Sequence, residues 1–192
     1  MLYSICFMQE GEFELELKET KIGSKRIYDG KIIKLDVDTV TLPNGESATR
    51  ELVRHPGGVG VVALDGDGSI YLVRQYRIPY DNILLEIPAG KLDKGEDTAV
   101  AAHRELAEET GLRCGKLEFL GNFYPSVGFL DENLRMYLAT ELSQGETHPD
   151  DDEFVNTVKM PFDDAVKLIM GGEIKDGKTV AAILKVKVLK NL

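Results

Sequence analysis

Three glutamates crowd into the last part of one predicted helix: Glu105, Glu108 and Glu109. Glu105 and Glu109 are one helical turn apart, so they share a face, and Glu108 lies beside them. Uncompensated like charges at this spacing destabilise a helix by roughly a few tenths of a kcal/mol. A hard divalent cation reverses that effect, because Mg²⁺ prefers oxygen ligands and is commonly held by one or two carboxylates together with substrate phosphates. A solvated acidic face is the ordinary alternative for such a run taken alone.

The residues around this helix stand at fixed spacings that make the acidic run specific. The pattern is Gly90-x5-Glu96-x7-Arg104-Glu105-Leu106-x-Glu108-Glu109-x-Gly111-Leu112. It resembles the Nudix box, the loop–helix–loop signature of Nudix hydrolases, and every specified position is filled. The resemblance implies an α/β (α+β) fold, an α/β/α sandwich with a mixed sheet. It also implies Mg²⁺-dependent hydrolysis of a nucleoside diphosphate linked to another moiety.

The resemblance also implies roles for individual residues of the box. Glu105 and Glu109 would ligate the metal together with the backbone carbonyl of Ala89, and Glu108 would join through a water or a further ion. Arg104 would orient the carboxylates, and the glycine at position 90 would let the backbone pass close to the metal. Mg²⁺ is the expected ion, with Mn²⁺ as a substitute.

The general base is expected on an acidic loop beyond the box, with the sequence HPDDDEFV. The resemblance favours Glu153 as the group that deprotonates the attacking water. Asp150, Asp151 and Asp152 remain alternatives, because loop alignment does not separate neighbouring acids and a base must lie within hydrogen-bonding reach of the water.

The stretch FYPSVGFLDE, residues 123–132, narrows the substrate. It resembles the YPSPGFxDE-like pattern that ADP-ribose pyrophosphatases carry downstream of the box, with Val127 in place of the second proline. The likeness to this subfamily extends over nearly the whole chain. It implies cleavage of ADP-ribose to AMP and ribose 5-phosphate, and a homodimer in which the N-terminal lobe helps build the nucleotide pocket.

Six residues are expected to bind the substrate on the strength of this resemblance. They are Arg50, Glu51, Arg77, Ser126, Gly128 and Glu132. Arg77 also suits the role chemically, because a guanidinium binds phosphate oxygens with two parallel donors. The alternative for Arg77 is an ion pair with a neighbouring acid. Arg54 and His55 are weaker candidates, each equally consistent with a structural role.

Length and composition set further bounds. A chain of 192 residues with 43% hydrophobic and 29% charged residues is an ordinary globular domain with a small extra lobe. We expect an N-terminal β lobe over 1–55 and a hydrolase domain over 56–192.

The net charge of −10 disfavours nucleic acid polymers as partners. The two cysteines have no metal-type spacing, and no apolar run approaches the roughly 20 residues of a membrane span. We expect a cytoplasmic protein.

The elements that must position these residues follow from periodicity and turn signals. Strands are predicted at 13–20, 31–42, 46–55, 59–65, 69–77, 82–87, 116–122, 134–141 and 154–160. Helices are predicted from 97 or 98 to 110, over 162–170, and from about 179 to 190. Pro43-Asn44-Gly45 supplies a hairpin turn, and Gly111 can take the left-handed conformation that ends the acidic helix.

Two other functions are consistent with these motifs. The first is hydrolysis of another sugar nucleotide, such as ADP-glucose or a GDP-sugar, because the residues that choose the sugar are not recognisable in the sequence. The second is a sensor that binds ADP-ribose without cleaving it. Such proteins commonly carry a DNA-binding domain or a degraded box, whereas here the box is intact and no basic helix-turn-helix pattern follows it.

Overall fold

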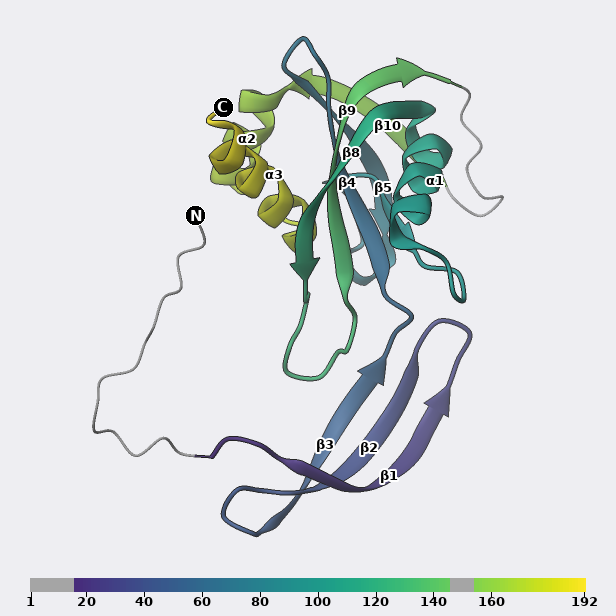
Figure 1. The fold of residues 1–192 in the computed structure, drawn as a ribbon, viewed down its shortest axis with the longest axis vertical. Coiled ribbons are helices and arrows are strands. Elements are labelled where there is room, and N and C mark those ends of the chain that lie inside the picture. The colour runs from purple at the N-terminus through teal and green to yellow at the C-terminus, as the bar shows by residue number, and fades with distance from the viewer. Residues whose placement is uncertain (1–15, 146–153) are drawn as a thin grey trace, which may run out of the picture.

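The computed structural model describes residues 16–145 and 154–192, which form two β-sheets and three α-helices (Figure 1). The larger sheet has the order β10-β5-β4-β9-β8, with β6 paired to β5 and β7 paired to β4. Its strands are β4 Gly58–Leu64, β5 Ser69–Arg77, β6 Asn82–Glu86, β7 Ala89–Lys91, β8 Leu112–Phe123, β9 Leu134–Gln144 and β10 Val155–Pro161. Strand β4 runs parallel to β9 and antiparallel to β5, so the sheet is mixed.

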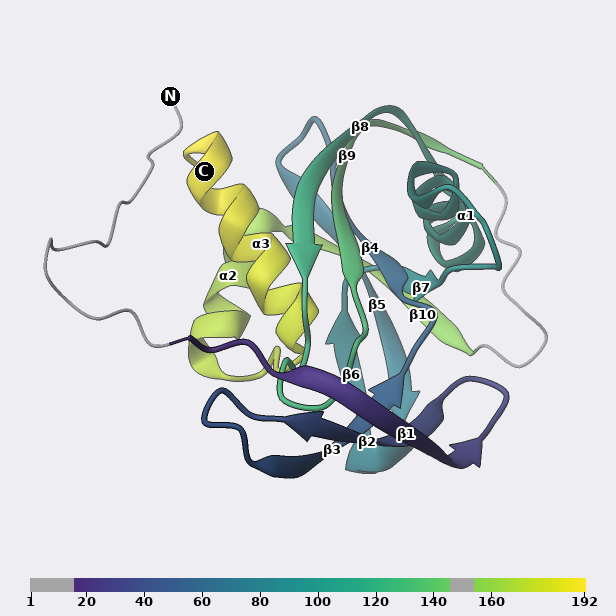
Figure 2. The same cartoon turned by 60° about the horizontal axis from the view of Figure 1, so that its bottom comes forward.

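Helices cover both faces of this sheet (Figure 2). Helix α1, Thr98–Thr110, packs on one face, and α2, Phe162–Gly171, and α3, Gly177–Lys190, pack on the other. The central strand β4 is buried on both sides: Val61 contributes to the cluster with α1, and Val62 to the cluster with α2 and α3. The expected α/β/α sandwich with a mixed sheet is confirmed.

A second, three-stranded antiparallel sheet forms a lobe that projects from this sandwich (Figure 1). Its strands are β1 Thr20–Asp29, β2 Lys34–Thr41 and β3 Ser47–Arg54. The predicted hairpin between β2 and β3 is confirmed, with Gly45 at φ 86° in its turn. The buried side chains of β2 include Asp36 and Asp38, which pair with arginines and lysine rather than forming an apolar core.

The largest differences between predicted and observed strands concern β1, β7 and β8. Residues 16–19 of the predicted strand 13–20 are not in a strand, and residues 13–15 lie outside the described chain; β1 instead occupies Thr20–Asp29. Nine of its ten residues are exposed, so the strand has no alternation of buried and exposed positions to recognise. The three-residue β7 was missed, and β8 begins at Leu112 rather than at residue 116.

The helices follow their local signals closely. The Asp97 side chain accepts hydrogen bonds from the backbone N–H groups of Ala99 and Val100, and Gly111 ends α1 at φ 70°. Helix α3 begins two residues earlier than predicted, because Asp176 caps it by accepting from the Thr179 N–H. No helix in the described part of the chain is long and apolar enough to cross a membrane.

Candidate active site

Arg104 holds the carboxylates of α1 together. Its Nη1 donates to Glu105 Oε1 at 2.8 Å and to Glu108 Oε2 at 2.9 Å. On its other side, Nε and Nη2 donate to the two oxygens of Glu96, each at 2.9 Å. These bonds lower the pKa of Glu96 to about 2 and raise the pKa of Arg104 above its ordinary value. Glu96 therefore anchors the guanidinium, and the guanidinium orients the glutamates of α1.

The backbone of β7 passes directly against the buried carboxylates of α1. Glu105 and Glu109 are 6% and 3% exposed. A Cβ atom at Gly90 would lie 1.9 Å from Glu105 Oε1, so only glycine fits there. The neighbouring Ala89 N–H donates to Glu109 Oε2 at 3.0 Å. Two carboxylates and the backbone of residues 89 and 90 thus converge between α1 and β7.

This donor set suits a hard divalent cation. Carboxylate oxygens are the ligands Mg²⁺ prefers, and two buried ones beside a bare backbone leave room that any larger residue at position 90 would fill. In the described ranges no three acidic, histidine or cysteine side chains are arranged as a ready cation site. The Arg104 guanidinium pairs with Glu105 and Glu108 in this arrangement. A cation at Glu105 and Glu109 would either replace Arg104 as the partner of Glu105 or bind next to it.

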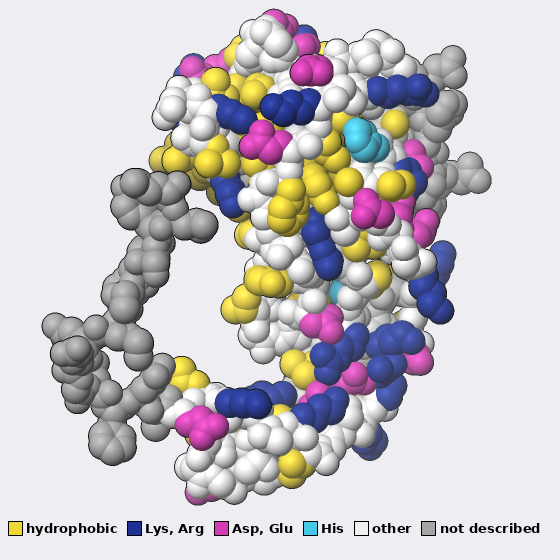
Figure 3. Space-filling model, in the orientation of Figure 1, with side chains coloured by type: hydrophobic (Ala, Val, Ile, Leu, Met, Phe, Trp, Pro, Cys, Tyr) yellow, Lys and Arg dark blue, Asp and Glu magenta, His cyan; other side chains and the backbone are white. Residues whose placement is uncertain are grey.

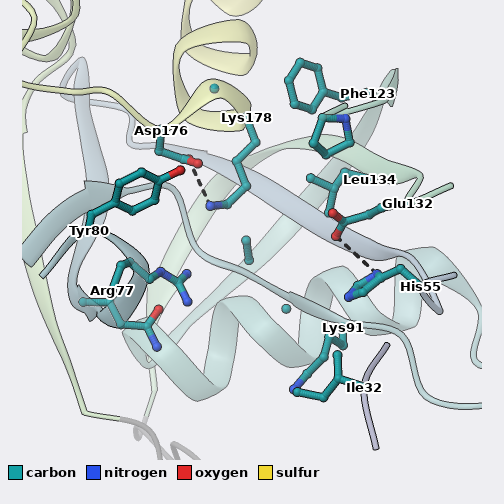
Figure 4. Close-up of a pocket in the computed structure, with 15 residues that line it drawn as sticks. Ile32, His55, Arg77, Tyr80, Lys91, Phe123, Glu132, Leu134, Asp176 and Lys178 are labelled. Carbon is teal, nitrogen blue, oxygen red and sulfur yellow. Dashed lines mark ion pairs between the residues drawn. The ribbon is translucent and has the colours of Figure 1, made fainter. Parts of the chain in front are cut away.

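A pocket of about 560 Å³ opens beside Ala89 and Gly90 (Figure 4). Its walls come from β5, η1 (Ile78–Tyr80), β7, the 123–134 segment and the start of α3, with one residue from the lobe. The lining residues are Ile32, His55, Gln75, Arg77, Tyr80, Ala89, Gly90, Lys91, Phe123, Pro125, Glu132, Leu134, Asp176, Gly177 and Lys178. The mixture of an apolar wall with cations beside a carboxylate cluster fits an anionic ligand with apolar parts.

One wall of the pocket carries a buried ion-pair network. Arg77 donates from Nε and Nη2 to the two oxygens of Glu86, at 2.7 and 2.9 Å. Lys178 donates to the same carboxylate and lies 3.0 Å from Asp176 Oδ2. Burial raises the pKa of Glu86, but the hydrogen bonds and charges of the two cations outweigh it and hold the pKa below its usual value. Glu86 is therefore ionised at neutral pH.

The opposite wall is fastened to the lobe. The Val53 N–H donates to the Phe129 carbonyl at 2.7 Å, and the Asp131 N–H donates to the Val53 carbonyl at 3.1 Å. Asp131 also pairs with Arg54 at 3.2 Å and accepts the backbone N–H of residue 55 at 2.8 Å. Figure 3 shows basic and acidic side chains side by side where the lobe meets the main body. The last strand of the lobe thus holds the loop that carries Glu132.

The predicted site residues divide into two groups. Arg77, Ala89 and Glu132 line the pocket, and the glutamates of α1 lie against its floor at Ala89 and Gly90. Both alternatives for Arg77 are present together, because it pairs with an acid and lines the pocket.

The remaining predicted residues lie away from this pocket or beyond the described residues. Arg50 pairs with Glu19, with Nε 3.0 Å from Oε2, and Glu51 stands on the same strand of the lobe. Ser126 and Gly128 belong to the fastened loop but do not line the pocket. The proposed base Glu153 lies outside the described residues, as do Asp150, Asp151 and Asp152.

Sequence reasoning missed three charged residues that line the pocket, Lys91, Asp176 and Lys178, and it missed Glu86, which holds Arg77 and Lys178. A signal existed for Glu86, since a lone acid in the apolar run ILLEIP suggests a buried, paired charge. The DGKT run before the last helix indicated a helix cap. It did not indicate that its lysine contacts Glu86, 92 positions earlier in the chain.

Comparison with protein families finds two matches. The NUDIX domain family matches residues 54–183, and the nucleoside diphosphate sugar hydrolase N-terminal domain matches residues 19–53. The second match coincides with the projecting lobe, so each sheet of the structure corresponds to one family model.

Curated relatives match along most of their length. The chain is 46% identical over 168 residues to a methanol dehydrogenase activator of Bacillus methanolicus, covering 86% of this chain and 91% of that one. It is 45% identical over 169 residues to an ADP-ribose pyrophosphatase of Bacillus subtilis, covering 87% and 91%. A crystal structure of an ADP compounds hydrolase has the same fold, with a TM-score of 0.82 at 20% identity over 94% of this chain and 97% of that chain.

Proposed function

The chain belongs to the Nudix hydrolase family, and on that premise we propose that it hydrolyses the diphosphate of ADP-ribose to AMP and ribose 5-phosphate. The observation that carries the proposal is the 45% identity to an ADP-ribose pyrophosphatase over 91% of that protein's length, lobe included. The pocket supports it, because it has room for a dinucleotide-sized anion and carries cations beside the carboxylate cluster.

Glu105 and Glu109 are the residues we propose to hold Mg²⁺, with the backbone of Ala89 beside them and Glu108 as a further, outer carboxylate. A bound Mg²⁺ would neutralise diphosphate charge and activate water for attack on phosphorus. Arg104 keeps the glutamates oriented through its bonds to Glu105 and Glu108. Glu109→Gln removes one anionic ligand and leaves an amide of the same shape, so we expect loss of turnover with an unchanged melting temperature.

We propose that Arg77 and Glu132, which line the pocket, bind the substrate. The other predicted contacts do not line this pocket in the single chain and stay predictions: Arg50, Glu51, Ser126 and Gly128. Arg77 is suited to phosphate because Nε and Nη2 hold Glu86, whereas Nη1 bonds to no other residue in the described ranges. The hydrogen bonds that Arg77 donates to Glu86, and the negative charges of Glu86, Glu109 and Asp176, raise the pKa of Arg77, so it stays cationic in the working pH range.

Glu153 is our proposed general base, and its test is a comparison among the acids of its loop. A general base contributes on the order of a hundredfold or more to kcat. We expect Glu153→Gln to lower kcat by that amount, while Asp150→Asn, Asp151→Asn and Asp152→Asn stay near the wild-type value. If one of the three aspartate variants shows the large loss instead, the assignment moves to that residue.

The decisive experiment incubates the purified chain with ADP-ribose and Mg²⁺ and measures AMP by chromatography. ADP-glucose and a GDP-sugar serve as comparison substrates, and Mn²⁺ as the comparison metal. We expect AMP formation with the highest kcat/KM for ADP-ribose. AMP no higher than in a metal-free control would contradict the proposal, and a higher kcat/KM for another sugar nucleotide would reassign the substrate.

A second candidate is activation of a methanol dehydrogenase, because a relative of equal similarity carries that name. The rate of methanol oxidation by a purified methanol dehydrogenase, with and without the chain, tests it. An unchanged rate would remove this candidate, and an increase that Glu109→Gln abolishes would tie it to the hydrolase site.

We also propose a homodimer. Large apolar side chains are exposed on the lobe, including Ile22 at 61%, Ile27 at 51% and Tyr28 at 56%. A three-stranded sheet with such surfaces and buried charges in place of an apolar core gains stability when a partner covers it.

Cytoplasmic location and the absence of a nucleic acid polymer as partner remain predictions, to be tested by cell fractionation and by a nucleic acid binding assay.

A further inference from the structure

Lys178 enters the pocket from α3, whereas Arg77 comes from β5 and the glutamates of the box come from α1. It stands in the first turn of α3, and its side chain points toward the middle of the pocket, across from Lys91 (Figure 4). Its side chain is 12% exposed, so the ammonium group is largely removed from bulk water. A lysine in such a place needs anionic partners, and it has two: Glu86 and Asp176.

The partners of Lys178 leave part of its donor capacity for a ligand. An ammonium group has three donors. In the described chain, one contacts Glu86 and one lies near Asp176, which leaves a third donor. Lys178 also shares Glu86 Oε2 with Arg77, so a single buried carboxylate fixes two cations on the same pocket wall.

The two cations of this wall face the pocket and suit a phosphate group. The network of Arg77, Lys178, Glu86 and Asp176 is neutral as a whole, so its attraction for a phosphate depends on the direction of its two cations, which line the pocket while Glu86 lies behind them. The side chains of Arg77, Lys178 and Glu86 are 37%, 12% and 2% exposed. Low exposure strengthens the field that such a group exerts on a ligand. A chain of net charge −10 otherwise repels a diphosphate, so cationic donors that face the pocket are needed opposite the carboxylates of α1.

We propose that Lys178 is a substrate-binding residue that contacts the diphosphate together with Arg77, and that Glu86 is the positioning residue that sets the distance between the two cations. This inference rests on the proposed function, since it assigns a new contact to the same substrate. These three residues connect the sheet to the layer of α2 and α3, because Arg77 and Glu86 come from the hairpin of β5 and β6 and Lys178 comes from α3.

The test measures binding rather than turnover. The probe is α,β-methylene ADP-ribose, in which a CH₂ group replaces the bridging oxygen so that the diphosphate is not cleaved. Isothermal titration calorimetry with Mg²⁺ gives its Kd for the wild type and for Lys178→Gln, which can still donate a hydrogen bond to Glu86 but carries no charge. We expect Kd to rise about tenfold to a hundredfold, the range of a lost charge-assisted hydrogen bond.

Two further variants separate binding from folding. Lys178→Arg keeps the charge and should recover most of the affinity. Lys175→Met removes an exposed lysine three residues earlier, outside the pocket, and should leave Kd unchanged. Melting temperatures report any structural role. If Lys178→Gln lowers the melting temperature but binds the probe with wild-type affinity, Lys178 has only a structural role and the inference is overturned.

The same experiment distinguishes this inference from the proposed function. Binding of the probe by the wild type with equal Kd in Lys178→Gln overturns the inference alone. Absence of binding by the wild type, with no AMP from ADP-ribose, overturns the proposed substrate and the inference with it.

Discussion

At the scale of single residues, the site depends on Arg104, which is bonded to three glutamates. Only the pair with Glu108 follows directly from helical spacing; the bonds to Glu96 require the loop before α1 to fold back on the helix. The box predicted that these residues act together. It did not predict that Glu96, rather than a helix residue, fixes the guanidinium.

Glu96 gives a prediction about pH. Its pKa falls from 4.5 to about 2 in the folded protein, so its bond to Arg104 stabilises the fold fully above pH 4.5. The stabilisation is lost as the pH falls from 4.5 toward 2, because in this range the unfolded chain binds a proton at Glu96 that the folded protein does not yet bind. Urea denaturation of the wild type and Glu96→Gln at several pH values measures this.

We expect the wild type to be the more stable protein at pH 7, and the difference between the two to shrink steadily below pH 4.5. Asp67→Asn is not a suitable control, because the pKa of Asp67 also falls to about 2. Glu173→Gln, which removes an exposed acid that forms no ion pair or side-chain hydrogen bond with the described residues, is the control for the loss of a surface charge. A pH-independent difference for Glu96→Gln would contradict the role given to its bond with Arg104.

At the scale of elements, residues separated widely in sequence meet because strands and helices bring them together. Periodicity and turn residues predicted α1 and β5 with their observed ends, apart from the choice of the first helical residue. The short β7 was not predictable, because three residues carry no period. Nor was the meeting of Lys178 with Glu86 across 92 positions, which depends on how α3 packs on the sheet.

The attachment of the 126–132 loop to β3 gives a prediction at this scale. Asp131→Asn removes the ion pair with Arg54 while leaving the backbone bonds to Val53. A partly exposed pair contributes about 1 kcal/mol or less, which corresponds to a factor of about five. We expect KM for ADP-ribose to rise by up to about that factor, with kcat little changed, because Glu132 is the pocket residue next to the broken contact.

Steady-state kinetics measures the effect, and Asp164→Asn is the matched control. It breaks a surface pair of similar kind with Lys167, 2.7 Å apart on α2, away from the pocket. Equal KM values in the wild type, Asp131→Asn and Asp164→Asn would show that the lobe does not support the loop.

At the scale of the whole molecule, the lobe is exposed in the single chain, and its expected partner is a second copy. We expect a mass of about twice 21.3 kDa by light scattering after gel filtration. Ile27→Lys adds a charge to the apolar surface of β1 and should shift the population toward monomer, because a buried unpaired charge is costly at an interface. Val188→Lys, at an exposed position of α3, should leave the mass unchanged. A wild-type monomer would contradict the proposal.

The position of the lobe was the least predictable part of the fold. Its β2–β3 hairpin followed from alternation and from the turn at residues 43–45. Its position against the sandwich depends on the bridge between Val53 and Leu130 and on the ion pair between Arg54 and Asp131. Such contacts have no sequence period, because charged pairs are chosen by geometry rather than by spacing.

Gly90 has a consequence for reading other sequences of this kind. Its φ lies outside the left-handed region, so backbone conformation alone would allow alanine at this position. What excludes alanine is the Glu105 carboxylate, which occupies the space of a methyl group. The glycine therefore records the location of a side chain fifteen positions later. A related chain with a larger residue at this position must place the corresponding carboxylate elsewhere, so this one position indicates where that side chain lies.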